Sequence, residues 1–163
     1  MRKAILGIVM CLLTAVSAAA QTADAQMMAP IQKFMEAFNK GDIAGAAATH
    51  AAGADLIILD EVAPFLWRGA GAFQAWAADL DTDAKKNGIT DQMVTISAAT
   101  RAETNGDGAY VIVPLVYTFK QRGVAMREAA QMTFALKKGT SGWLIHGWTW
   151  TGPRATAAGA ARP

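Results

Sequence analysis

The chain carries a helical pattern of apolar positions in its first half and a strand-like pattern in its second. Between residues 27 and 40, apolar residues recur three and four positions apart, which predicts an amphipathic helix. Gly41 ends this helix, and Asp42 is a suitable N-cap for a second helix from 43 to about 50. A third helical pattern runs from about 70 to 86.

Beyond the third helix the pattern predicts strands joined by tight turns. A short apolar strand at 54–59 precedes that helix, and four alternating segments follow it at 90–102, 109–120, 124–137 and 143–151. Glycine-containing turns separate the last three of these segments. This order predicts an α+β fold in which N-terminal helices wrap one side of a curved antiparallel sheet.

A different pattern precedes the first helix. A cationic pair at 2–3 is followed by an apolar run at 4–16, which is too short for a stable membrane anchor, and then by small residues. The pattern predicts a signal peptide over 1–20, with cleavage after Ala20 or after Ala25, and hence a periplasmic or secreted protein. The alternative interpretation is a buried N-terminal helix of the domain.

Cleavage changes the composition of the working protein. The single cysteine, Cys11, leaves with the apolar run, so no thiol, disulfide or cysteine metal site is expected afterwards. Of the 15 basic residues, 13 lie beyond residue 20 against 13 acidic ones, so the formal charge falls from +2 to near zero. Without a basic surplus, nucleic acid is not an expected partner. The domain is expected over 27–152, without a membrane anchor, and 153–163 as a disordered tail.

Several short motifs follow one another in a characteristic order within the domain. They are Phe34-x-x-Ala37-Phe38-Asn39-x-Gly41-Asp42, Leu59-Asp60-Glu61, Trp67-Arg68-Gly69 with Phe73-x-x-Trp76, and Gly142-Trp143-Leu144-Ile145-His146. In this order they resemble the nuclear transport factor 2-like superfamily, in its SnoaL-like and ketosteroid-isomerase-like branch. The resemblance implies a cone-shaped, cystatin-like α+β roll with a cavity at its wide end, usually in a homodimer. Its members include cofactor-independent enzymes and binding proteins, so the fold alone assigns no function.

Two neighbouring carboxylates are the first candidates for chemistry. Asp60 and Glu61 follow the first short strand, and a carboxylate at the mouth of an apolar cavity can serve as a general base because desolvation raises its pKa. In the isomerase-like enzymes that this chain resembles, an acidic residue at about this place removes the proton. The alternative is that both residues simply solvate the end of a loop.

Glu128 and His146 are the other two polar candidates. Strand parity places Glu128 among apolar residues, either as a pocket acid or as the partner of an arginine such as Arg101 or Arg122. The same parity puts His146 on one face with the tryptophans of the last strand, as a core or interface residue or as a catalytic partner. Because the other histidine, His50, stands alone at a helix end, where a cationic side chain suits the dipole, no metal site is expected.

The oxyanion-binding groups of the isomerases are absent from their expected places. Those enzymes hold the developing oxyanion with a phenol and a protonated carboxylic acid. This chain has Phe34 where the first helix should supply the phenol, and Gln131 and Met132 where the second-to-last strand should supply the acid. Steroid isomerisation by that mechanism is therefore not expected.

Large apolar side chains predict the walls of a pocket, because aromatic residues and methionines line adaptable apolar sites. The expected ligand-binding residues are Phe34, Phe38, Trp67, Trp76, Tyr117, Met126, Met132 and Trp148. Trp148 and Trp150 point the same way, toward either a pocket or a dimer interface.

The sequence thus predicts an exported pocket protein for a small, largely apolar organic molecule. It would act, if it is an enzyme, by proton transfer without a cofactor or metal. The alternative is a non-catalytic binding or dimerisation module.

Overall fold

The computed structural model describes residues 10–159, with side chains from residue 25 onward. The predicted cationic pair at 2–3 and the last four residues of the predicted tail lie outside the described residues. Helices occupy the first half of the chain and most of the strands the second. The helices are α1 (Met10–Asn39), α2 (Ile43–Ala47) and α3 (Ala72–Asn87). The strands are β1 (Ile57–Leu59), β2 (Leu66–Arg68), β3 (Ile89–Ile96), β4 (Arg101–Asn105), β5 (Gly108–Gln121), β6 (Val124–Gly139), β7 (Gly142–Thr151) and β8 (Thr156–Ala157).

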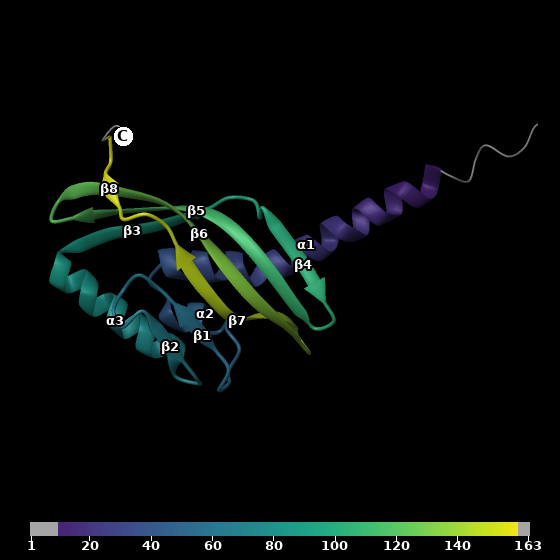
Figure 1. Cartoon of the computed structure of the whole chain (residues 1–163), viewed down its shortest axis with the longest axis horizontal. Helices are drawn as coiled ribbons and strands as arrows, with labels where there is room; N and C mark the ends of the chain where they lie inside the picture. The colour runs from purple at the N-terminus through teal and green to yellow at the C-terminus, as the bar shows by residue number, and fades with distance from the viewer. Residues whose placement is uncertain (1–9, 160–163) are drawn as a thin grey trace, which may run out of the picture.

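The strands form one curved sheet, and the helices lie against its concave side (Figure 1). The strand order is β2-β1-β7-β6-β5-β3, with β4 beside β5 and β8 beside β6. This confirms the predicted α+β class. One pairing differs from the expected antiparallel sheet, since β1 runs parallel to β7. Between β1 and β7 the chain passes through β2, α3 and the strands β3 to β6. A connection of this length allows β7 to lie beside β1 in the parallel direction.

Two further differences concern short elements. The expected strand at 90–102 is split into β3 and β4, which lie end to end along one edge of the longer β5. Part of the segment expected to be a disordered tail instead forms β8, in which Ala157 pairs with Met126 of β6. The pattern of apolar residues predicts neither the break between β3 and β4 nor the strand β8. Each of these short strands forms because a longer neighbouring strand, β5 or β6, offers it a free edge.

Helix α1 is longer than the predicted helix and continues through both predicted cleavage positions. Its N-terminal part projects past the sheet, and its later turns cover the sheet (Figure 1). In the part of the chain that the structure describes, no helix has the length and apolar character to cross a membrane.

The corner between α1 and α2 follows the prediction. Gly41 adopts φ +67°, which glycine tolerates without steric cost, and the Asp42 carboxylate caps α2 by accepting the backbone N–H of Gly45 at 2.8 Å. Asn39, the last residue of α1, then attaches the helix to β3. Its amide donates to the Val94 carbonyl at 2.8 Å and accepts the Val94 N–H at 2.7 Å. These bonds fix the distance between α1 and the sheet.

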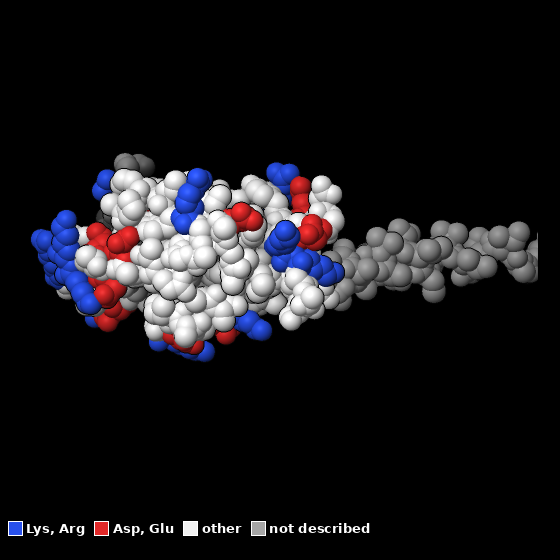
Figure 2. Space-filling view, turned by 90° about the horizontal axis from the view of Figure 1, so that it is seen from below, with Lys and Arg blue, Asp and Glu red and all other residues white. Residues whose placement is uncertain are grey.

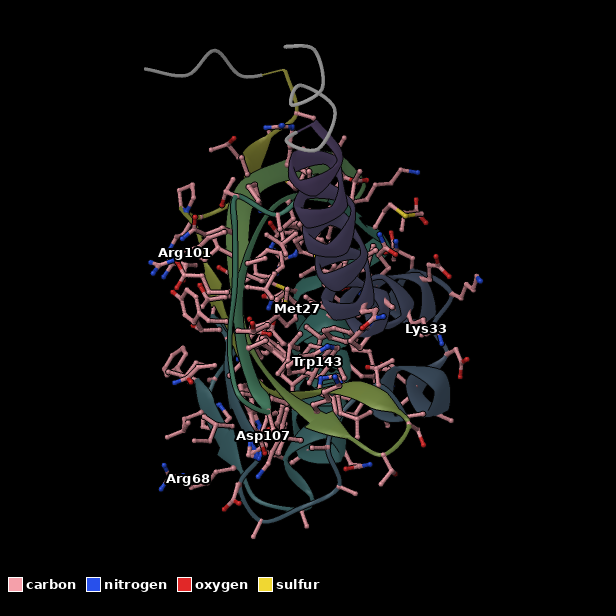
Figure 3. The ribbon with its side chains drawn as sticks, turned by 90° about the vertical axis from the view of Figure 1, so that its right-hand side faces the viewer. Met27, Lys33, Arg68, Arg101, Asp107 and Trp143 are labelled. Carbon is pink, nitrogen blue, oxygen red and sulfur yellow. The ribbon has the colours of Figure 1, made fainter. Side chains whose placement is uncertain are left out.

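The core fills the space between the helices and the concave face of the sheet. Met27 and Trp143 point into this space, whereas Lys33, Arg68 and Arg101 point away from it (Figure 3). On the face seen from below, basic and acidic side chains are interspersed over a largely uncharged surface (Figure 2).

Candidate functional site

A partly enclosed cavity of about 100 Å³ lies between α1, α3 and the concave face of the sheet. Its walls are mainly apolar and aromatic. The lining residues are Phe34, Met35, Phe38, Asp60, Glu61, Val62, Trp76, Leu80, Asp83, Ile89, Val94, Tyr117, Phe119, Met132, Trp148 and Trp150. The predicted residues Asp60, Glu61, Phe34, Phe38, Trp76, Tyr117, Met132 and Trp148 are all among them.

Asp60 enters the cavity from the end of β1. Its Oδ2 accepts a hydrogen bond of 2.6 Å from Nε1 of Trp76 on α3, and its Oδ1 accepts the backbone N–H of Glu61 at 2.6 Å. Burial raises the pKa of the Asp60 carboxyl above its ordinary value, and these hydrogen bonds oppose the rise. The result is an oriented carboxylate of increased basicity in an apolar cavity.

Glu61 and Glu128 form a pair of neighbouring carboxyl groups. Partial desolvation of its carboxyl group, followed by repulsion from Glu128, raises the pKa of Glu61 to about 7, although the residue as a whole is exposed at the mouth of the cavity. Glu128 is only 2% exposed, and burial raises its pKa as well. Its Oε1 accepts a hydrogen bond of 2.8 Å from Nε1 of Trp150, whereas its buried Oε2 has no hydrogen-bond partner among the described residues.

The aromatic donors around the cavity are already engaged with acceptors of the protein. Trp76 donates to Asp60 and Trp150 to Glu128, as described, while Trp148 donates from Nε1 to Nε2 of His50 at 3.1 Å. The Tyr117 hydroxyl donates to Oε1 of Gln92 at 2.6 Å. Within the described part of the chain, the aromatic walls therefore present no free N–H or O–H group to a ligand.

His50 is a buried neutral histidine behind the cavity wall. Its ring packs between Phe34 and Phe73, with ring centroids 4.8 Å and 4.6 Å away, and its Nδ1 lies 3.0 Å from the Ala46 carbonyl. Burial lowers its pKa to about 4. Since Nε2 accepts from Trp148, the proton of the neutral ring is assigned to Nδ1. The expectation of a cationic side chain at a helix end was therefore wrong for His50.

His146 does not lie on the cavity face, contrary to the prediction. The register between β6 and β7 shifts at Ala135/Leu136, so that Ile145 faces Leu136 while Gly147 faces Ala135. His146 is the extra residue of this bulge, and strand parity reverses there. A second set of contacts accompanies the bulge, since the backbone of Ile145 also bonds to Thr49 and Ala51. Trp148 and Trp150 consequently share the cavity face with Ile145 rather than with His146.

Two predicted wall residues lie elsewhere. Trp67 on β2 is buried, but its indole donates to Oδ2 of Asp79 at 2.8 Å and does not line the cavity. Met126 pairs with Phe119 on one side and with Ala157 of β8 on the other, beyond the cavity. Residue type and strand parity give the character and the face of a side chain, but they do not give its position along that face, so neither residue could be placed relative to the cavity from the sequence.

Glu128 lies on the predicted face, directly behind the cavity wall. It stands opposite Tyr117 in the register between β5 and β6, and both its neighbours Tyr117 and Trp150 line the cavity. In the part of the chain that the structure describes, Glu128 forms no ion pair with Arg101 or Arg122, and Arg101 instead bonds to Glu103. Glu128 is thus a buried acid of the pocket rather than half of an ion pair.

Two residues that line the cavity, Asp83 and Trp150, were not among the predicted site residues. Asp83 lines the cavity from α3 and accepts a hydrogen bond of 2.9 Å from the Asn87 amide. It lies seven positions after Trp76 and three after Leu80, a spacing that places all three on one helix face. This spacing could have identified it. Among the side chains that the structure describes, those of residues 25–159, no three His, Cys, Asp or Glu residues are grouped so that they could hold a metal ion.

Solved structures with the same arrangement of helices and strands share little sequence with this chain. A nuclear transport factor 2-like superfamily protein from Salmonella enterica serovar Typhimurium superposes with a TM-score of 0.68 at 14% identity, covering 88% of this chain and 99% of the other. The chain has the nuclear transport factor 2-like fold.

Other proteins with the nuclear transport factor 2-like fold are named for enzymes. A ketosteroid isomerase-like protein from Erwinia carotovora atroseptica gives a TM-score of 0.62 at 21% identity, over 80% of this chain and 95% of that one. A type 2 hexachlorocyclohexane dehydrochlorinase (LinA) gives 0.67 at 14% identity, over 91% and 97%. No family model and no curated protein sequence matches this chain. The likeness thus confirms the fold expected from the sequence motifs.

Proposed function

We propose that the cavity binds a compact, largely apolar organic molecule and that Asp60 transfers a proton to or from it. The observation that carries this proposal is the placement of Asp60, a carboxylate of raised pKa that Trp76 holds in an aromatic cavity. A general base must be oriented toward its substrate and have a pKa closer to the working pH than that of an exposed carboxylate. Structures of the same fold are named as an isomerase-like protein and a dehydrochlorinase, which supports an enzymatic use of such a cavity.

The size of the cavity limits the ligand. An apolar cavity of about 150 Å³ holds one benzene molecule. At about 100 Å³, the cavity holds a group of a few heavy atoms unless its walls move. We therefore propose a small molecule, or a larger one that inserts only a compact end.

The second candidate function is binding without catalysis. It is favoured by the engagement of all the aromatic donors, because stabilisation of a developing oxyanion requires donors aimed at it. With none free on these described walls, a reaction through an enolate or alkoxide lacks its usual support. Proton transfer through a neutral or cationic intermediate does not need such donors.

Solvent deuterium exchange separates the two functions even when the product is unidentified. Compact compounds are first screened by thermal shift, and each bound compound is then incubated with the protein in D2O. Proton transfer predicts incorporation of deuterium at carbon that Asp60→Asn abolishes while binding persists. The double variant with Glu61→Gln shows whether Glu61 shares the role. Binding without any incorporation supports the binding module, and equal incorporation by Asp60→Asn removes Asp60 from the mechanism.

We further propose that the protein is exported and acts as a homodimer. The cationic start, apolar run and small residues near Ala20 and Ala25 support export. The mass of protein recovered from the periplasm of an expressing bacterium tests this proposal, since it should match a chain that begins at residue 21 or 26. Light scattering on the same material measures the oligomeric state.

A further inference from the structure

The polar groups of the cavity are strongly biased toward acceptors. Three carboxylates line it, those of Asp60, Glu61 and Asp83, and a fourth, Glu128, lies directly behind the wall. The set of lining residues that the structure describes contains no lysine, arginine or histidine. The cavity therefore carries an excess of negative charge whenever these groups are ionised.

One of these acceptors is unpartnered. Oε2 of Glu128 is buried, and no donor of the described residues reaches it, while Oε1 is held by Trp150. The neighbouring group is the Glu61 carboxyl, which is itself an acceptor when ionised. Because a buried acceptor without a donor destabilises the folded state, a ligand that brings donors or positive charge would relieve this cost.

The walls around the carboxylates are faces and edges of aromatic rings. Trp76 and Trp148 meet at 5.1 Å with an interplanar angle of 85°, and Tyr117 and Trp150 at 5.8 Å with 82°. Each pair is in edge-to-face contact, and all four rings line the same cavity. Boxes of aromatic rings bind alkylammonium groups through the negative faces of the rings.

We propose that the cavity takes a small organic cation, a compact alkylammonium group held by Asp60 and Glu61 and enclosed by Trp76, Trp148, Trp150 and Tyr117. This inference rests on the proposed function for the place of the ligand, but it changes the ligand's class from neutral to cationic. It also agrees with the engaged donors of the walls, since a cation needs acceptors and π faces rather than donors. The reacting molecule would then pass through a cationic or neutral state rather than an oxyanion.

The electrostatics at Tyr117 support the assignment. After burial, the four carboxylates of Glu61, Asp60, Glu128 and Asp83 are the causes that raise the pKa of its hydroxyl. They all act at one point of the cavity wall, which is thus a region of negative potential. The cation that acts on Glu61 is Arg154, an exposed residue between β7 and β8 outside the cavity lining.

A pair of isosteres tests the inference. Choline and 3,3-dimethylbutan-1-ol have the same shape and differ in the charge of the central atom. Calorimetric titration at pH 8, where Glu61 is mostly ionised, should show choline binding at least about tenfold more tightly than the alcohol. Isobutylammonium and 2-methylpropan-1-ol form a second pair that includes N–H donors.

Variants locate the charge preference. Glu61→Gln should weaken choline binding about tenfold and leave that of the alcohol within about twofold, because it removes charge while keeping shape. Asp60→Asn provides a second test of the same kind. Glu103→Gln, a surface variant of the Arg101 ion pair, is the matched control and should leave both affinities unchanged.

Three results would overturn the inference. Equal affinity within both pairs, or a preference for the alcohols, rejects a cationic ligand but leaves the neutral pocket of the proposed function intact. Cation binding that Glu61→Gln and Asp60→Asn do not weaken places the cation elsewhere on the protein. Failure of all four probes rejects the inference, and the broader screen of compact compounds then decides the proposed function separately.

Discussion

Nε1 of Trp76 lies 2.6 Å from Oδ2 of Asp60, and this hydrogen bond joins α3 to the end of β1. The bond orients the carboxylate toward the cavity and favours its ionised form. It therefore opposes the burial of Asp60, which favours the neutral form. The balance of these two effects sets the proton affinity of the proposed base.

Replacement of Trp76 by phenylalanine should raise the pKa of Asp60 further, because burial then acts without the opposing indole bond. Carbon-13 NMR titration of the carboxyl groups measures this shift directly. Trp67→Phe is the matched control, since the indole of Trp67 donates to Asp79 and does not line the cavity. A pKa of Asp60 that is the same in both variants would show that the indole bond is unimportant.

Replacement of Glu128 by glutamine should lower the pKa of Glu61 from about 7 toward its ordinary value of 4.5, since it removes a neighbouring like charge. It should not reach that value, because burial is the larger cause. A raised carboxyl pKa means that the folded state loses stability as the pH rises from 4.5 to 7, so the variant should lose less. The same NMR titration and urea unfolding at several pH values test both effects, with Glu103→Gln as the control. An unchanged Glu61 titration would mean that the two carboxyls do not interact.

Because His50 is buried in its neutral form, we expect the folded protein to lose stability in acid. The unfolded chain protonates His50 near pH 6.5, whereas the folded chain resists protonation until about pH 4, because the ring is buried and Nε2 accepts from Trp148. The folded state should therefore lose about 3 kcal/mol from this group as the pH falls from 6.5 to 4. The difference in unfolding free energy between the protein and His50→Gln isolates the effect from that of the carboxyls. A difference that does not change across this pH range would contradict a neutral, buried His50.

Gly152 provides a steric test of the wall behind the cavity. A Cβ atom at this position would lie 2.5 Å from Oε1 of Glu128 and 2.6 Å from Cβ of Ala130. Gly152→Ala should therefore destabilise the fold by about 1–3 kcal/mol. Gly53→Ala is the control, because a Cβ there meets nothing within 4 Å. Equal melting temperatures for the two variants would show that the chain after β7 does not pack closely against Glu128.

Features of the fold that depend on regular local patterns could be predicted from the sequence, whereas those that depend on irregularities or distant contacts could not. Alternation along β5 and β6 placed Tyr117, Met132 and Glu128 on the correct face, because these strands are long and regular. It failed at His146, where a one-residue bulge in β7 reverses the parity and leaves no signal in the apolar pattern. The order of the motifs indicated the fold, but the parallel pairing of β1 with β7 depends on contacts between distant segments.

The candidate site shows the same division. Asp60 and Glu61 were identified by their position after a strand, which is a local feature. The sequence could not predict the hydrogen bonds from Trp76 to Asp60 and from Trp150 to Glu128. Each bond joins two elements whose relative placement depends on the whole fold and not on the local sequence. The bias of the cavity toward acceptors is visible only when these bonds are known.

The indole N–H resonances test the central claim, that the cavity is the ligand-binding site, most directly. Trp76, Trp148 and Trp150 line the cavity, whereas Trp67 and Trp143 do not. In a nitrogen-15 correlation spectrum with an excess of any compound that the thermal-shift screen shows to bind, the first three resonances should shift and the other two should stay in place. A bound compound that shifts only Trp67 and Trp143, or that leaves all five resonances in place, would contradict the account.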